Sequence, residues 1–193
     1  MGVPSYFKWI SDRHKTLIRD DLPVCDKRIL FLDFNGAIHP AVKADPQLLL
    51  DNMPAAVCMY LDNLINQCQP TEVYIAIDGV APRAKMEQQR ERRYKSAMES
   101  NYLRDLALRT GREALLRKEP VDFNMISPGT KFMDDLHEKL IVHIKEKYTK
   151  MIVTLNGANV AGEGEHKIMD EIRKRNDSEI SGNQYIVYGL DAD

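Results

Sequence analysis

The sequence predicts an α/β fold in which a mostly parallel central sheet is flanked by helices. Short apolar, β-branched runs alternate along the chain with longer helical patterns. These apolar runs are nearly continuous, which is typical of strands buried on both faces of a parallel sheet. The 193 residues, 44% of them hydrophobic, can form one core and leave little room for two. We therefore expect a single domain over residues 1–193, with right-handed strand–helix–strand crossovers.

The first third of the chain is expected to hold one strand between two helices. Residues 3–19 predict a helix whose apolar face is mostly core. The residues of that face are Tyr6, Phe7, Trp9 and Ile10. Residues 28–34 (RILFLDF) predict a buried strand, and residues 47–66 predict a helix that Pro54 is expected to break.

The middle of the chain predicts a strand followed by two helices. The strand is expected over residues 72–78 (EVYIAID). A highly charged helix follows over residues 83–117, directly after Pro82, because proline is favoured at the start of a helix. A Ser-Pro-Gly turn at residues 127–129 then precedes a helix over residues 131–147.

The last part of the chain completes the alternation. Residues 151–155 (MIVTL) and residues 184–190 (QYIVYGL) predict strands. Residues 165–175 predict the helix between them. The pattern shows no internal repeat and no low-complexity segment, which agrees with one domain.

Composition excludes several classes of protein. The 27 Lys and Arg against 29 Asp and Glu give a net charge of −2, which excludes a histone-like polycation. Three cysteines without a CxxC pair indicate neither a disulfide scaffold nor a cysteine zinc site. The apolar runs are too short to span a bilayer, and no hydrophobic signal stretch opens the chain. We expect a soluble intracellular protein, nuclear or cytoplasmic, without a membrane partner.

Carboxylates fall at the ends of the expected strands and in one glycine-rich turn. The six are Asp33, Asp78, Glu163, Glu165, Asp191 and Asp193. The carboxyl ends of parallel strands meet at one edge of a sheet, so we expect all six to converge there. Alternate residues of an extended segment share a face, which pairs Asp191 with Asp193. The glycines around Glu163 permit a tight turn that brings both glutamates to the same point.

A cluster of carboxylates predicts a metal site. Like charges so close repel and raise each other's pKa unless cations neutralise them. Oxygen ligands of this kind favour Mg²⁺ or Mn²⁺ over zinc. Two such ions can activate a water and stabilise the leaving oxygen in phosphodiester hydrolysis. For any one of these acids, the alternative to metal binding is that it caps a helix or lies in solvent.

A basic helix directly follows Asp78. Residues 83–118 carry eleven Lys or Arg against five Asp or Glu, an excess of six in a near-neutral chain. Four polar residues fall within an arc of about 100° on one face of this helix. They are Lys85, Gln89, Arg92 and Arg93. The positive end of the helix dipole lies on the same side, so the pattern predicts a phosphate pocket, although a solvated helix face is the alternative. A phosphate held beside hydrolytic metals points to a nuclease that acts from a phosphorylated end.

Six blocks of the sequence, read in order, resemble the XRN-type 5′→3′ exoribonucleases. They span nearly the whole chain, and several exceed six residues. The blocks are MGVP with YFKWIS (1–4 and 6–11), LDFNGAIH (32–39), AIDGVAPRAKM continuing to Arg93 (76–93), ISPGT with FM (126–130 and 132–133), GEGEHKIM (162–169) and YGLDAD (188–193).

The resemblance implies a PIN-like α/β nuclease domain that removes mononucleotides processively from single-stranded RNA bearing a 5′-monophosphate. By position, the six carboxylates are similar to the ligands of two Mg²⁺ or Mn²⁺ ions. The four residues of the basic helix are similar to a phosphate pocket too tight for a cap or triphosphate, and Gly2, Val3 and Pro4 are similar to residues near the active-site entrance. His39 is similar to the residue that stacks on the first base. His166 is expected to make structural hydrogen bonds.

The resemblance also implies segments that follow Asp193 in the family, including a further metal-binding aspartate and a base-stacking aromatic. A sheet lacking its later strands would be incomplete, so the alternative function is a truncated fragment that binds RNA 5′ ends or a protein partner without cleavage. A haloacid-dehalogenase-type phosphatase is disfavoured because it needs an aspartate where Asn35 stands. A flap endonuclease shares the metal chemistry, but the block at residues 81–93 does not resemble that family.

Overall fold

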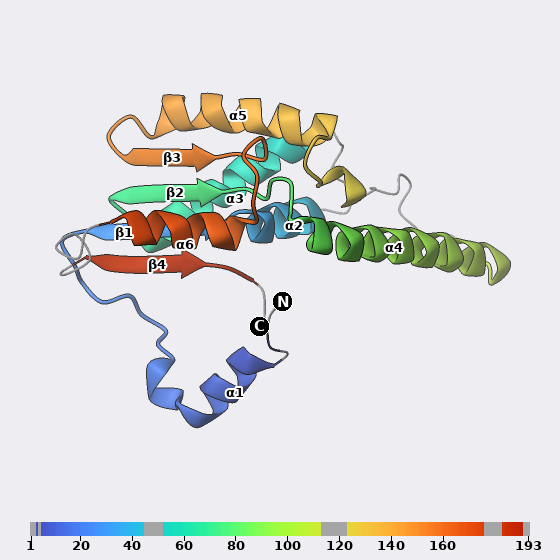
Figure 1. Cartoon of the computed structure of the whole chain (residues 1–193), viewed down its shortest axis with the longest axis horizontal. Helices are drawn as coiled ribbons and strands as arrows, with labels where there is room; N and C mark the ends of the chain where they lie inside the picture. The colour runs from blue at the N-terminus through green and yellow to red at the C-terminus, as the bar shows by residue number, and fades with distance from the viewer. Residues whose placement is uncertain (1–2, 4, 45–51, 113–122, 176–182, 191–193) are drawn as a thin grey trace.

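Four parallel strands form one sheet in the order β3-β2-β1-β4 (Figure 1). A computed structural model describes residues 3, 5–44, 52–112, 123–175 and 183–190. The strands are β1 (Arg28–Asp33), β2 (Glu72–Ala76), β3 (Ile152–Asn156) and β4 (Gln184–Tyr188). The predicted α/β class with a parallel sheet is confirmed, and all four predicted strands are present.

The helices follow the prediction in most places. They are α1 (Tyr6–Arg13), α2 (Asn35–Ala44), α3 (Met53–Cys68), α4 (Arg83–Arg109), α5 (Lys131–Lys147) and α6 (Gly164–Lys174), with 3₁₀ turns η1 (Lys15–Leu17) and η4 (Phe123–Met125). Pro54 lies in the first turn of α3, where proline is tolerated, and therefore does not break that helix. Helix α2 was not predicted, because Pro40 lies inside it and hides its helical pattern.

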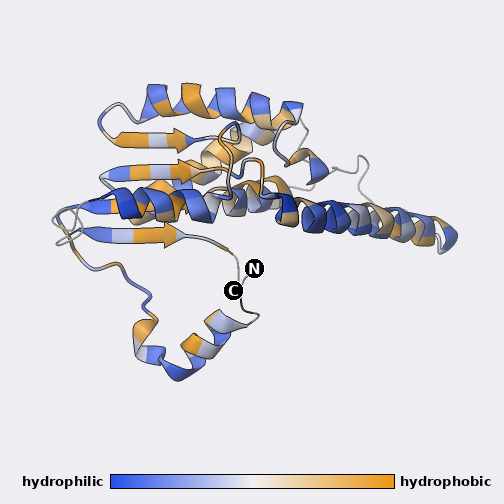
Figure 2. Cartoon of the chain, viewed as in Figure 1, coloured by the Kyte–Doolittle hydropathy of each residue, from blue (hydrophilic) through white to orange (hydrophobic). Residues whose placement is uncertain are grey.

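The core lies on both faces of the sheet. Alternate residues of β1 point to opposite faces, so Leu30 and Leu32 pack with α2, α3 and α5, whereas Ile29 and Phe31 pack with α6. Figure 2 shows the strands as largely hydrophobic and the long helix α4 as mainly hydrophilic. No helix in the described part of the chain has both the length and the hydropathy needed to cross a membrane.

The predicted packing of the N-terminal helix is wrong. The helix ends at Arg13, and none of its residues is buried: Phe7 is 61% exposed and Trp9 is 48% exposed. Its aromatic residues instead contact each other, with the Tyr6 and Trp9 rings stacked at 6.2 Å and the Arg13 guanidinium 4.6 Å from the Trp9 ring. Helix α1 lies apart from the sheet, so the apolar face has no core to enter (Figure 1).

The strand register brings the carboxyl ends of the strands to one edge. Asp33 pairs with Ala76, Ala76 pairs with Asn156, and Leu32 pairs with Tyr188. Helix α4 begins beside this edge and projects beyond the sheet (Figure 1). Side chains from the strand ends, from α2 and from the first turns of α4 therefore meet at this edge.

Candidate functional site

The first residue of α6 contacts both aspartates at the sheet edge. Asp33 is the last residue of β1, and Asp78 lies two residues beyond the end of β2. The Gly164 amide donates to Asp78 Oδ1 at 2.6 Å, and a Cβ built on Gly164 would lie 2.6 Å from Asp33 Oδ1. Any larger residue at this position would displace the Asp33 carboxylate, so the glycine permits the close approach.

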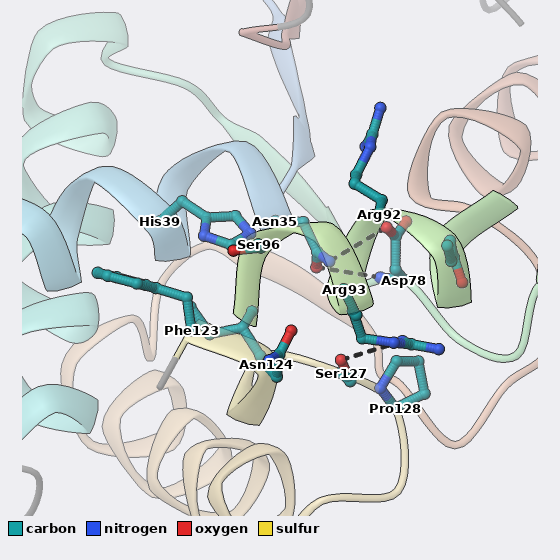
Figure 3. A pocket seen from close by; sticks show the side chains of 12 residues that line it. Asn35, His39, Asp78, Arg92, Arg93, Ser96, Phe123, Asn124, Ser127 and Pro128 are labelled. Carbon is teal, nitrogen blue, oxygen red and sulfur yellow. Dashed lines mark hydrogen bonds between the residues drawn. The ribbon is translucent and has the colours of Figure 1, made fainter. Parts of the chain in front are cut away.

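Asn35 holds the other oxygen of Asp78. Its Nδ2 donates to Asp78 Oδ2 at 3.1 Å, and its Oδ1 accepts the Asp78 amide at 3.2 Å (Figure 3). Burial raises the pKa of Asp78, the charge of Glu163 raises it further, and the Gly164 amide and two lysines only partly oppose this. The pKa of Asp78 remains above its ordinary value, so the surrounding positive charge compensates the ionised Asp78 only in part.

The turn that carries the two glutamates is held against the chain that follows β2. The Gly79 amide donates to Gly162 O at 2.9 Å, and the Gly162 amide donates to Val80 O at 3.0 Å. A Cβ on Gly79 would lie 1.8 Å from Val160 O, so only glycine permits this approach. Gly162 adopts a φ of 110°, which side chains rarely tolerate. Gly162 in the turn and Gly79 in the chain after β2 therefore both permit the contact between these two segments.

Glu163, Glu165 and His166 form a group that could hold a metal ion. One ligand atom from each lies within 4.8 Å of the others. Glu163 immediately precedes α6, and Gly164 links it to Asp33 and Asp78. The donors are mainly carboxylate oxygens, which suits a hard divalent ion, and the imidazole adds a nitrogen donor. His166 is exposed beside these acids, a position that differs from the structural role expected of it.

Lys85 pairs with an acid at this edge. Its Nζ lies 3.1 Å from Glu163 Oε2. Gln89, one helical turn after Lys85 on α4, lines a cavity next to this edge. Lys85 itself does not line that cavity. The structure therefore connects the basic helix to the acidic group through this ion pair.

A cavity of about 260 Å³ opens between α2, the first turns of α4 and the segment 123–128 (Figure 3). Gln89, Arg92 and Arg93 line one wall, with Ser96 one turn further along α4. The opposite wall comes from the segment 123–128, whose Ser127 Oγ accepts from Arg93 Nη1 at 3.3 Å. The remaining lining residues are Asn35, His39, Asp78, Phe123, Asn124, Ile126 and Pro128.

Two rings stand near one end of the cavity. The His39 and Phe123 ring centroids are 6.4 Å apart and their planes are inclined by 37°. His39 is one helical turn after Asn35 on α2, so both side chains face the cavity. The cavity thus combines arginines, a carboxylate and two aromatic faces, a set that matches a phosphate joined to a base.

Lys167 lies beneath the acidic turn and is 6% exposed. Its Nζ donates to Ile77 O at 2.7 Å and to Gly157 O at 3.0 Å. Burial lowers the pKa of Lys167, and the nearby Asp78 opposes this.

The structure describes nine of the eleven predicted site residues. It brings Asp33, Asp78, Glu163 and Glu165 to one edge, and it places Gln89, Arg92, Arg93 and His39 in the cavity with Lys85 beside Glu163. Asp191 and Asp193 lie outside the described residues, as do Gly2 and Pro4. The sequence reasoning missed the roles in this site of Asn35, Phe123, Asn124, Ser127 and His166. Asn35, Ser127 and His166 do fall within the blocks that resemble the family, but no role in the site was assigned to them: Ser127 was interpreted as a turn residue and Asn35 as a missing aspartate.

A family comparison covers the whole chain. The family model described as XRN 5'-3' exonuclease N-terminus matches residues 1–193.

Curated relatives agree with the family match. The 5'-3' exoribonuclease 1 of Saccharomyces cerevisiae is 36% identical and the human 5'-3' exoribonuclease 1 is 37% identical, each over 100% of this chain. The 5'-3' exoribonuclease 2 of Kluyveromyces lactis is 36% identical, also over 100% of this chain. The chain spans 14%, 12% and 24% of the lengths of these three relatives, in that order.

Proposed function

Because the chain belongs to the family of XRN 5'-3' exonuclease N-termini, we propose that it is the nuclease portion of an enzyme that degrades RNA from the 5′ end. The resemblance seen in the sequence and the PIN-like α/β fold that it implied are confirmed by this membership. The proposed substrate is single-stranded RNA with a 5′-monophosphate, and the proposed products are mononucleotides.

One observation carries the proposal. Asp78 connects the arginine-lined cavity with the group formed by Glu163, Glu165 and His166: it lines the cavity, and its carboxylate accepts from the amide of Gly164, which separates the two glutamates in the chain. A terminal phosphate held by the cavity would therefore place the adjoining phosphodiester near the carboxylates. Proximity of this kind supplies much of the advantage of a hydrolytic site.

The described carboxylates fit a divalent metal. Oxygen donors dominate the group, positive charge compensates Asp78 only in part, and the absence of a side chain on Gly164 lets the Asp33 carboxylate lie against the start of α6. Asp33, Asp78, Glu163 and Glu165 would hold the metal, together with Asp191 and Asp193 on the sequence prediction. When bound, two Mg²⁺ or Mn²⁺ ions supply activation of water and stabilisation of the leaving oxygen.

The cavity residues bind and orient the RNA in this proposal. Arg92 and Arg93 bind the terminal phosphate through charge-assisted hydrogen bonds, and Gln89 donates a neutral one. His39 stacks on the first base, and the Phe123 ring beside it keeps that end of the cavity apolar. Lys85, paired with Glu163, lies between the phosphate residues and the acids and contributes positive charge to both.

The proposal is tested by comparing three RNAs of one sequence that differ only at the 5′ end. We expect Mg²⁺-dependent release of mononucleotides from the 5′-monophosphorylated RNA and slow or no release from the 5′-hydroxyl and 5′-triphosphate forms. Equal rates for all three would refute the phosphate pocket. Asp191→Ala should abolish cleavage and leave RNA binding intact, whereas retained cleavage would exclude Asp191 as a metal ligand.

The alternative is a chain that binds RNA 5′ ends without cleaving them. The observation in its favour is that Arg92 and Arg93 line a cavity whose lining does not include Glu163, Glu165 or His166, so a 5′ end could bind there without those three residues. This alternative predicts RNA affinity that falls steeply with salt, because Arg92 and Arg93 contact phosphate. It also predicts no product when Mg²⁺ or Mn²⁺ is added, so the same assay separates the two functions.

A further inference from the structure

Lys167 is the only charged side chain that is buried in the part of the chain that the structure describes. Removing an ammonium group from water is costly unless its donors find partners. Its nearest hydrogen-bond partners are not carboxylates but two backbone carbonyls, those of Ile77 and Gly157. The arrangement therefore differs from an ordinary buried ion pair and requires a separate explanation.

The two carbonyls belong to different strand ends. Ile77 follows β2 and immediately precedes Asp78, and Gly157 follows β3. Lys167 itself is on α6, one turn after Glu163, and its amide donates to Glu163 O at 3.1 Å. One side chain thus connects the segment that carries Asp78, the end of β3 and the helix whose start carries Glu163 and Glu165.

The lysine stem also lies close to the acidic turn. A Cβ built on Gly162 would lie 3.9 Å from both Cγ and Cε of Lys167, which is ordinary van der Waals contact. The stem therefore lies on the side of Gly162, the residue of the turn with a positive φ, to which a side chain would project. Movement of Lys167 would change the packing beside the turn and the position of Ile77 together.

We propose that Lys167 is a positioning residue that fixes the distance between Asp78 and the Glu163–Glu165 pair by tying the ends of β2 and β3 to α6. This inference rests on the proposed function, because it assigns Lys167 to the geometry of the metal-binding acids. Lys167 does not touch the metal or the RNA in this role. Its effect passes through the backbone at Ile77 and through the turn at Gly162.

The test measures Mn²⁺ affinity of the 193-residue chain at fixed neutral pH, from the paramagnetic resonance signal of free Mn²⁺. Lys167→Met removes the charge and donors but keeps a similar stem, and Lys174→Met removes the same charge from the exposed end of α6. We expect Lys167→Met to weaken Mn²⁺ binding by about 10–100-fold, as loss of a residue that orients ligands does. Lys174→Met should bind as the unchanged chain does.

The sign of the effect separates positioning from simple electrostatics. Loss of a positive charge near a cation site should tighten Mn²⁺ binding if geometry is preserved. Equal or tighter binding by folded Lys167→Met therefore overturns the inference. If the unchanged chain takes up no Mn²⁺, the proposed metal chemistry fails, and the premise of this inference fails with it.

A second pair of variants covers loss of folding. If thermal unfolding shows that Lys167→Met is not folded, Lys167→Arg and Lys167→Gln are compared instead. Arginine keeps donors long enough to reach both carbonyls, so we expect it to bind Mn²⁺ more tightly than glutamine despite its positive charge. The reverse order, which electrostatics alone predicts, overturns the inference.

Discussion

Two aspartates in different regions of the molecule accept several hydrogen bonds, yet their ionisation is shifted in opposite directions. Asp62, on α3, interacts with residues at the end of α5: His143 Nε2 at 2.8 Å, Lys147 Nζ at 2.6 Å and the Tyr148 hydroxyl. Asp78, at the sheet edge, accepts from the Gly164 amide at 2.6 Å and Asn35 Nδ2 at 3.1 Å. The partners of Asp62 include a cation, whereas the hydrogen-bond donors to Asp78 are neutral.

The pKa values follow from this difference. Burial alone raises the pKa of Asp62, but hydrogen bonds from Lys147, Tyr148 and His143 bring it below its ordinary value. Burial also raises the pKa of Asp78, and the neighbouring Glu163 charge adds to that effect. A carboxylate whose charge is fully compensated within the protein stabilises the fold, and one that is compensated only in part is available to a cation. The comparison therefore assigns Asp62 to stability and Asp78 to the site.

The largest expected effect is on activity, from Asp78→Asn. This change keeps the shape of the side chain but removes the charge, so metal binding should fail and release of mononucleotides from 5′-monophosphorylated RNA should fall by about 10³-fold or more. Asp62→Asn is the matched control, because it makes the same chemical change outside the site. Loss of activity in both folded variants would contradict the assignment of Asp62 to stability and of Asp78 to the site.

The reciprocal effect on stability is expected from Asp62→Asn. The amide can no longer accept from all three donors, and loss of charged hydrogen bonds should lower the free energy of unfolding by about 2 kcal/mol. Urea denaturation followed by circular dichroism measures this change. A midpoint equal to that of the unchanged chain would show that the α3–α5 contacts do not depend on the Asp62 charge.

The loss of stability in Asp62→Asn should depend on pH, and this dependence tests the role assigned to Asp62. The pKa of Asp62 is below its ordinary value of 3.8 in the folded chain and close to that value when unfolded. The stability that Asp62 contributes is therefore complete above pH 3.8 and is lost as the pH falls through the lower folded value. The unchanged chain and Asp62→Asn should differ in urea midpoint near neutrality and converge in acid. A constant difference at all pH values would contradict this assignment.

The sequence predicted the strands and the four described acids at the edge because each signal is local. A run such as residues 28–34 is apolar and β-branched, and parallel strands necessarily end at one edge. The α2 helix was missed because Pro40 lies inside it, and the α1 packing was wrong because periodicity identifies an apolar face without saying what covers it.

Parts of the site depend on tertiary contacts that no local pattern encodes. The spacing of Lys85 from Gln89 predicted one shared pocket, but the fold pairs Lys85 with Glu163, which is far away in the sequence. The wall that faces Arg93 comes from the segment 123–128, in which the sequence predicted only the turn at residues 127–129 and no part of the pocket. The role of Asn35 became evident only in the fold, where its side-chain amide hydrogen-bonds both the carboxylate and the backbone amide of Asp78.

A smaller effect is expected from Arg93→Met in the cavity. The loss of a charge-assisted hydrogen bond to the terminal phosphate should raise KM for 5′-monophosphorylated RNA by about tenfold. The KM for 5′-hydroxyl RNA should not change, so discrimination between the two RNAs falls. Arg109→Met, at the far end of α4, is the matched control. An equal rise in KM for both RNAs would mean that Arg93 contacts the chain of the RNA and not its end.

The smallest effect is expected from Ser127→Ala, which removes the acceptor of Arg93 Nη1. That bond is 3.3 Å long and neutral on the serine side, so its loss should raise KM for 5′-monophosphorylated RNA only about two- to threefold. The guanidinium remains in the cavity, and therefore kcat should stay unchanged. In a Ser127→Ala, Arg93→Met double variant the serine change should have no further effect, because its only contribution passes through Arg93. Additive losses would mean that Ser127 contacts the RNA itself, and the segment 123–128 would then be a binding surface in its own right.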